Sequence, residues 1–215
     1  MLKFQEEMTE LRRNTLAMAD ITASMVERSL NVLLTTDVDA ADIMVEDFSK
    51  VDHYDRKIEQ LAIKILTLYQ PMASDMRAVA TYMKCITYME RISKYCKNIA
   101  IATRYLADKP RYEVLECLRP MGETASCMVS IVINGLKNAS VDGFDRIIDM
   151  DDILDNALRE DMRKVIDFIT QCPESADVCT YYISVMKFLE RIGDHACKIA
   201  EKVTFMVTGF HAVIE

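Results

Sequence analysis

Glycine, proline and tryptophan are scarce in this chain of 215 residues, which has five glycines, four prolines and no tryptophan. A shortage of turn-forming residues favours long helices over many short strands. No run of roughly eighteen uncharged apolar residues is present, so we expect no membrane-spanning helix. The seven cysteines contain no Cys-x-x-Cys pair, which argues against a thiolate zinc site or a redox pair.

The net charge and the first residues of the sequence indicate what the protein binds and in which compartment it is found. The net charge of −8 argues against nucleic-acid binding as the main role, because neutralising phosphates requires a clustered excess of Lys and Arg. The opening residues MLKFQEEMTELRR become charged at once, so we expect no signal peptide there. We therefore expect a cytoplasmic protein whose cysteines are mostly reduced, small and buried.

Comparing the chain with itself reveals one unit written twice. Residues 22–27, TASMVE, align with 125–130, ASCMVS, at an offset of 103, and residues 89–101, MERISKYCKNIAI, align with 189–201, LERIGDHACKIAE, at an offset of 100. An offset that drifts by so little indicates two copies with small deletions in their loops. We predict repeats at 1–109 and 110–215, with the boundary at Lys109-Pro110.

Each copy contains three stretches with helical periodicity. The predicted helices cover 4–35, 38–68 and 74–107 in the first copy, and 111–138, 141–170 and 174–208 in the second. The segments Thr35-Thr36-Asp37 and Asn138-Ala139-Ser140 supply capping side chains, while Pro71 and Pro173 end helices. The short connections require antiparallel neighbours. We predict an all-α fold of two tandem three-helix bundles, with no β-sheet.

Two pairs of carboxylates in the second copy are candidates for chemistry. Glu190 and Asp194 are four residues apart on the last predicted helix, on a face that points away from the apolar stripe and therefore outward or toward a neighbour. Asp151 and Asp155 have the same spacing on the fifth predicted helix, where Asp151 falls within the apolar stripe. Carboxylates on neighbouring helices provide hard oxygen ligands, which suit iron, manganese, magnesium or zinc.

The first copy has changed two of these four positions. Phe48 stands where the second copy has Asp151, and Lys94 stands where it has Asp194, while Asp52 and Glu90 remain. The joint change suggests that the second-copy acids act together and that Asp52 and Glu90 form at most a weaker site. The alternative is a structural bundle whose acids are solvated and paired with cations such as Arg191. The absence of a Glu-x-x-His motif argues against a ferritin-like di-iron oxidase.

Four segments together resemble the PhoU family of phosphate-uptake and phosphate-signalling regulators. They are QPMASDMR (70–77), MERI (89–92), DDILD (151–155) and LERIGD (189–194). The resemblance covers nearly the whole chain. It implies a non-enzymatic regulator at the inner face of the membrane that couples a phosphate ABC transporter to a sensor histidine kinase. It also implies a homodimer, attachment to the membrane through protein partners only, and no nucleic-acid partner.

The resemblance further implies an iron or zinc site on Asp151, Asp155, Glu190 and Asp194. Gln70, Asp75 and Arg77 have two interpretations. Structurally, Pro71 ends a helix and Asp75 suits the positive end of the next helix dipole; functionally, the three residues form a docking edge for a partner.

Two rival functions stay open from the sequence: an accessory protein of another transporter, such as a sodium–phosphate symporter, and a metal-dependent enzyme that uses the acidic face. We expect no enzyme, because no nucleophile–base pair or glycine-rich phosphate loop is present.

Overall fold

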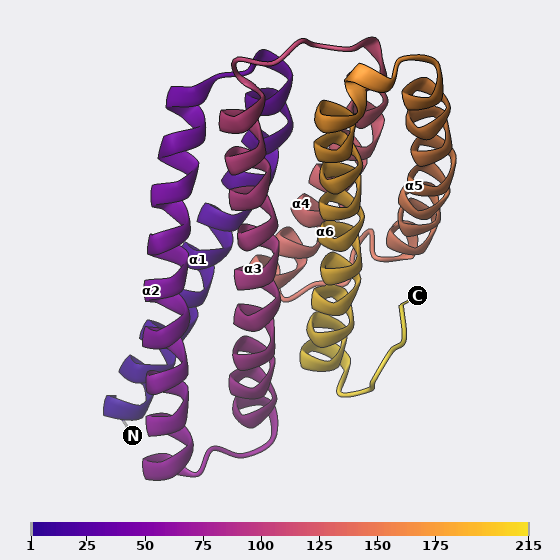
Figure 1. Ribbon diagram of the computed structural model, residues 1–215. Helices are drawn as coiled ribbons and strands as arrows, with labels where there is room; N and C mark the ends of the chain where they lie inside the picture. Colours follow the sequence, from indigo (N-terminus) through magenta and orange to yellow (C-terminus); the bar gives the residue numbers. More distant parts are fainter. Residues whose placement is uncertain (1, 215) are drawn as a thin grey trace.

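The computed structural model describes residues 2–214 and shows six long α-helices and two short 3-10 helices in that range, with no β-strand (Figure 1). In chain order they are α1 (Leu2–Thr35), α2 (Val38–Tyr69), α3 (Ala73–Leu106), η1 (Glu113–Cys117), α4 (Leu118–Asn138), α5 (Asp145–Gln171), η2 (Pro173–Ser175) and α6 (Ala176–Thr208). The predicted all-α fold is confirmed.

Most helix ends lie where the local chemistry of the sequence places them. The Asp37 side chain accepts a hydrogen bond of 2.9 Å from the Ala40 amide and so caps the start of α2. Helix α2 ends at Tyr69, where Gln70 adopts a left-handed conformation with φ of 46° immediately before Pro71. Helix α5 ends at Gln171, two residues before Pro173.

Three helices begin later than predicted: α6 by two residues, at Ala176, and α4 and α5 by more. Helix α4 begins at Leu118 rather than at residue 111, because Pro120 has no amide hydrogen and its ring would clash with a preceding helical turn. Residues 113–117 instead form a 3-10 helix. Helix α5 begins at Asp145 rather than at 141. Ser140 accepts a hydrogen bond from the Asp142 amide in a local turn, and Gly143 then takes a φ of 81°, which no residue inside a helix adopts.

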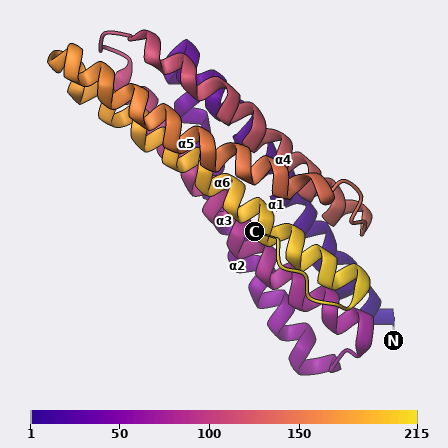
Figure 2. The same cartoon turned by 90° about the vertical axis from the view of Figure 1, so that its right-hand side faces the viewer.

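The two repeats pack into a single body. Helices α1 to α3 form one bundle and α4 to α6 the other, while α3 packs on α6 and α1 packs on α4. Figure 1 shows α2, α3, α6 and α5 in that order across one broad face, with α1 and α4 behind them, and Figure 2 shows the molecule turned by 90°. Buried side chains from all six helices form one continuous core, so the two repeats share a hydrophobic core instead of forming separate domains.

Side-chain contacts set the register of the antiparallel pair α3 and α6. The Tyr105 and Tyr181 rings stack with centroids 4.2 Å apart near one end of the pair. Near the other end, the Thr81 hydroxyl donates a hydrogen bond of 3.2 Å to the backbone carbonyl of Lys202. Among residues 2–214, no helix is long and apolar enough to cross a membrane.

Candidate metal site

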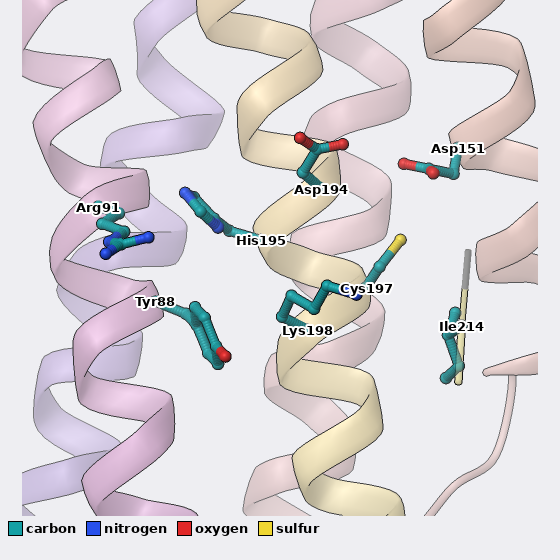
Figure 3. Close-up of a pocket in the computed structure, with 8 residues that line it drawn as sticks. All are labelled: Tyr88, Arg91, Asp151, Asp194, His195, Cys197, Lys198 and Ile214. Carbon is teal, nitrogen blue, oxygen red and sulfur yellow. The ribbon is translucent and has the colours of Figure 1, made fainter. Parts of the chain in front are cut away.

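The four acids predicted from the second copy lie on two packed helices. Asp151 and Asp155 are on α5, Glu190 and Asp194 are on α6, and all four side chains are partly buried. Figure 3 shows the Asp151 carboxylate extending from α5 toward α6, where Asp194 lies. The α6 pair therefore faces its neighbour α5, which is the second of the two orientations expected from the sequence.

Gly193 lets α5 approach α6 at this place. A Cβ atom on Gly193 would lie 2.5 Å from Leu154 Cδ1 and 3.5 Å from Asp151 Oδ1. The first copy has Ser93 at this position, which is fully buried and hydrogen-bonded to the Thr22 hydroxyl over 3.0 Å. Sequence reasoning missed the role of Gly193, although the difference between ERIGD and ERISK was a visible signal of it.

The acids repel one another across this interface. Burial raises the pKa of Asp151 above its ordinary value, and the Asp194 and Asp155 charges add to this, although a hydrogen bond with the Cys197 thiol acts in the opposite direction. Burial likewise raises the pKa of Glu190, with a further contribution from Asp194. The negative charge of these carboxylates is therefore not fully offset by neighbouring cations.

Nearby side chains supply part of the missing compensation. Arg191 Nη1 lies 2.7 Å from Asp194 Oδ2, and Arg191 Nε lies 3.4 Å from Glu190 Oε2. These are the ion pairs that the alternative interpretation anticipated. Burial raises the pKa of the Cys197 thiol, and the neighbouring Asp151 carboxylate raises it further, so this thiol stays protonated at neutral pH.

The donor types suit a metal ion, but the donors do not converge. Carboxylate oxygens under mutual repulsion are the ligands that a hard divalent cation stabilises. Within the described part of the chain, however, no three or more Asp, Glu, His or Cys side chains are arranged as a ligand set. A cavity of about 410 Å³ adjoins the site and is lined by Asp151, Asp194, His195 and Cys197, among others (Figure 3). Metal binding stays a prediction.

The corresponding region of the first copy differs in charge. Lys97 Nζ lies 4.6 Å from the centre of the Phe48 ring, and Asp52 pairs with Arg56 on its own helix. A further acid, Asp55, was missed from the sequence even though it lies one turn from Asp52. Burial raises the pKa of Asp55, with contributions from neighbouring acids that include Glu90.

The residues predicted to form a docking edge lie elsewhere. Gln70 and Asp75 are at the α2–α3 turn, at one end of the bundle, and Arg77 follows in the first turns of α3. The Arg77 Nε atom is buried without an acceptor, and its guanidinium carbon is 3.9 Å from where a Cβ on Gly209 would lie. This end of α3 therefore contacts the end of α6.

One protein-family model matches this chain along most of its length. The model described as the PhoU domain matches the chain twice, at residues 15–103 and 118–203. The chain belongs to the PhoU family. Its predicted repeat boundary at 109/110 falls between the two matched PhoU segments and stays a prediction.

Curated PhoU relatives match along nearly their full length. A phosphate-specific transport system accessory protein PhoU homolog from Zymomonas mobilis is 29% identical over 96% of this chain and 87% of the relative. PhoU homolog 1 from Thermotoga maritima is 28% identical over 96% of this chain and 89% of the relative. The homolog from Clostridium acetobutylicum is 22% identical over 96% and 94%. Relatives of this PhoU chain are thus named as accessory proteins of phosphate transport.

Solved PhoU structures have the same fold. The crystal structure of PhoU from Pseudomonas aeruginosa superposes with a TM-score of 0.92 at 25% identity, covering 96% of this chain and all of that one (100%). The phosphate transport system regulatory protein PhoU from Streptococcus pneumoniae superposes with a TM-score of 0.86 at 22% identity, covering 97% and 99%. The second likeness supports the fold alone.

Proposed function

We propose that this PhoU-family chain regulates phosphate uptake from the cytoplasmic side as a protein-binding accessory of a phosphate ABC transporter. The observation that carries the proposal is the double PhoU match together with full-length relatives named as phosphate transport accessory proteins. The partners we propose are the transporter, a sensor histidine kinase and a second copy of this chain. Regulation through binding requires no reacting group.

Deleting the gene in the organism that carries it tests this proposal. We expect phosphate-starvation genes to be expressed although phosphate is plentiful, and a plasmid copy to restore their repression. Uptake of radioactive phosphate, measured in the same strains, reports whether the transporter itself is affected. Unchanged expression and unchanged uptake in the deletion strain would refute the proposal.

A metal ion at the α5–α6 acids is the second part of the proposal. Asp151, Asp155, Glu190 and Asp194 would hold it, with iron or zinc as the candidate metals, and Asp52 and Glu90 would hold an ion more weakly. Burial, together with repulsion from neighbouring acids, raises the pKa of Asp151 and of Glu190, and this supports the assignment because a bound cation would offset both effects. When bound, the ion would link α5 to α6.

Thermal unfolding with and without Zn²⁺ or Fe²⁺ tests the metal proposal. Binding to the folded state raises Tm, by roughly 2–4 °C for each 1 kcal/mol in a chain of this size. We expect this increase in the wild type and in Asp52→Asn/Glu90→Gln, and its loss in Asp151→Asn/Glu190→Gln. An equal increase in both double variants would exclude the second-copy acids as the ligands.

Docking of a partner at Gln70, Asp75 and Arg77 is the third part. The exposed Met72 and Met76 at the same turn support it, because a partner docked there would cover their apolar surface. We expect Asp75→Asn/Arg77→Gln to fold normally by circular dichroism yet fail to restore repression in the deletion strain. Full complementation by this variant would remove the docking assignment.

A further inference from the structure

The two central helices of the broad face together carry a net positive charge, which comes from α3, while the charges of α6 balance. Helix α3 carries six Lys and Arg but only two Asp and Glu, and α6 carries four of each. The helices that flank them are acidic: α2 has seven acids and four Lys and Arg, and α5 has eight acids and four Lys and Arg. Figure 1 shows α3 and α6 side by side between α2 and α5, so a basic band lies between two acidic ones.

The exposed and partly exposed cations of this band follow one face of each helix. On α3 they are Lys84, Arg91 and Lys94, at steps of seven and three residues. On α6, Lys187, Arg191, Lys198 and Lys202 follow at steps of four, seven and four. These seven side chains form what we call the basic strip. The bond between Thr81 and the Lys202 carbonyl sets the register, and it brings Lys84 to within about one turn of Lys202.

Four cations of the strip have no carboxylate partner. Within residues 2–214, Lys84, Arg91, Lys94 and Lys187 make no ion pair or hydrogen bond. The acids of α6 are already used: Arg191 pairs with Glu190 and Asp194, Lys198 and Lys202 pair with Glu201, and Lys109 pairs with Asp177. Most other Lys and Arg of the chain have a carboxylate partner, so uncompensated positive charge is concentrated here although the whole chain has a net charge of −8.

One of these cations marks where the two repeats diverge. Lys94 occupies the position that Asp194 occupies in the second copy, and it lines a hollow of about 240 Å³ together with Glu90, Arg91, Tyr95 and Asn98, so that two cations and one carboxylate face this space. The first copy has therefore replaced a carboxylate that attracts cations with an ammonium that attracts anions. A hollow of this size has room for a side chain from another molecule.

We propose that the basic strip is a docking surface for a carboxylate-rich surface of a partner protein. Charge complementarity carries the proposal, because complementary potentials steer association and fix the register of two surfaces. An anionic bilayer fits less well, because a flat membrane laid on this face would also meet the acidic helices α2 and α5 and be repelled by them. A narrow acidic ridge on a partner protein would contact the basic strip without contacting α2 or α5.

The proposal rests on the proposed function only for the existence of a protein partner. Its test uses a fluorescently labelled peptide of ten glutamates as the acidic probe, with anisotropy measured at about 50 mM salt, where screening is modest. Failure of this test leaves the deletion experiment unaffected, and failure of the deletion experiment leaves this test interpretable. The two proposals are therefore distinguishable.

Two triple variants with the same loss of charge locate the binding. Lys84→Gln/Arg91→Gln/Lys94→Gln removes three cations of the strip. Lys3→Gln/Arg146→Gln/Arg163→Gln removes three cations that are also exposed and unpaired but lie outside it. We expect the dissociation constant of the peptide to increase at least about tenfold in the strip variant and to change less than about twofold in the control. Circular dichroism confirms that both variants are folded.

Three outcomes would overturn the proposal. The first is no binding of the peptide to the wild type, and the second is equal weakening in the two triple variants. The third is binding to vesicles of equal parts phosphatidylglycerol and phosphatidylcholine that is lost in the strip variant and kept in the control, which would assign the strip to a membrane. Binding of the peptide that depends on the strip, with no strip-dependent binding to vesicles, is the result we expect.

Discussion

The backbone of Gly193 in α6 lies against the Asp151 side chain of α5, so that a Cβ on the glycine would be 3.5 Å from Asp151 Oδ1. The same atom would be only 2.5 Å from Leu154 Cδ1, in a fully buried part of the interface. The glycine therefore sets the distance between the two helices that carry the candidate metal ligands. Its replacement in the first copy by Ser93 coincides with the loss of two of the four acids there.

Replacing Gly193 with serine, the residue of the first copy, is expected to destabilise the fold. Overpacking at a buried contact costs about 1–3 kcal/mol, which exceeds the gain of roughly 0.5 kcal/mol from replacing glycine inside a helix. Urea denaturation of Gly193→Ser should show a lower free energy of unfolding. Ala80→Ser, at an exposed position of α3, is the control and should change it by less than about 0.5 kcal/mol. If the free energy of unfolding of Gly193→Ser were unchanged, α5 could shift away from α6 at no cost in stability.

The first repeat contains an acid whose ion pairs should stabilise the fold at neutral pH. Arg28 Nη2 lies 2.5 Å and Lys50 Nζ lies 2.8 Å from the Asp47 carboxylate, whose side chain is 13% exposed. Burial alone would raise the pKa of Asp47, but the hydrogen bonds from Lys50 and Arg28 outweigh it and hold the pKa below its ordinary value. The ionised form is therefore favoured by folding.

Asp47→Asn should lower the free energy of unfolding at pH 7 by about 1–3 kcal/mol, because it removes charge-assisted hydrogen bonds. Because the folded-state pKa is lowered, this stabilisation is complete above the unfolded-state pKa of about 3.9 and is lost as pH falls through the folded-state pKa. Denaturation of both proteins at several pH values checks this. The difference between them should shrink below about pH 4, and a difference that grows on acidification would contradict the assignment.

Arg191 should compete with a metal ion for Glu190 and Asp194. Removing its guanidinium in Arg191→Gln leaves the two carboxylates without their counter-ion, so Zn²⁺ affinity measured by calorimetric titration should increase. An exposed ion pair of this kind is worth up to about 1 kcal/mol, which corresponds to an increase of about fivefold. Arg163→Gln, at an exposed position of α5, is the control and should leave the affinity unchanged. A large loss of affinity in Arg191→Gln would show that the arginine positions the acids instead.

The helices were predictable from the sequence because their ends depend on local chemistry. Asp37, Pro71 and Pro173 each act within a few residues of themselves, and the helix ends near them were predicted to within about two residues. Pro120 and Gly143 also act locally, and their effects on the starts of α4 and α5 were overlooked.

The site was less predictable because it depends on contacts between distant segments. The spacing of Glu190 and Asp194 identified one helix face, but not which helix would cover it. Packing between helices determines three features that the sequence did not reveal. Gly193 allows α5 to approach α6, Asp55 lies among further acids, and Lys84 lies within about one turn of Lys202. The basic strip in particular exists only because the two repeats join along α3 and α6.

Metal content of the purified protein tests the central proposal, that the acids of the second repeat bind a metal ion more strongly than those of the first. After expression with ample iron and zinc, we expect near-stoichiometric metal by elemental analysis in the wild type and in Asp52→Asn/Glu90→Gln. The same analysis of Asp151→Asn/Glu190→Gln should show the metal lost. A metal-free wild type, or equal loss in both double variants, would contradict the account and leave a regulator that acts through its protein-binding surfaces alone.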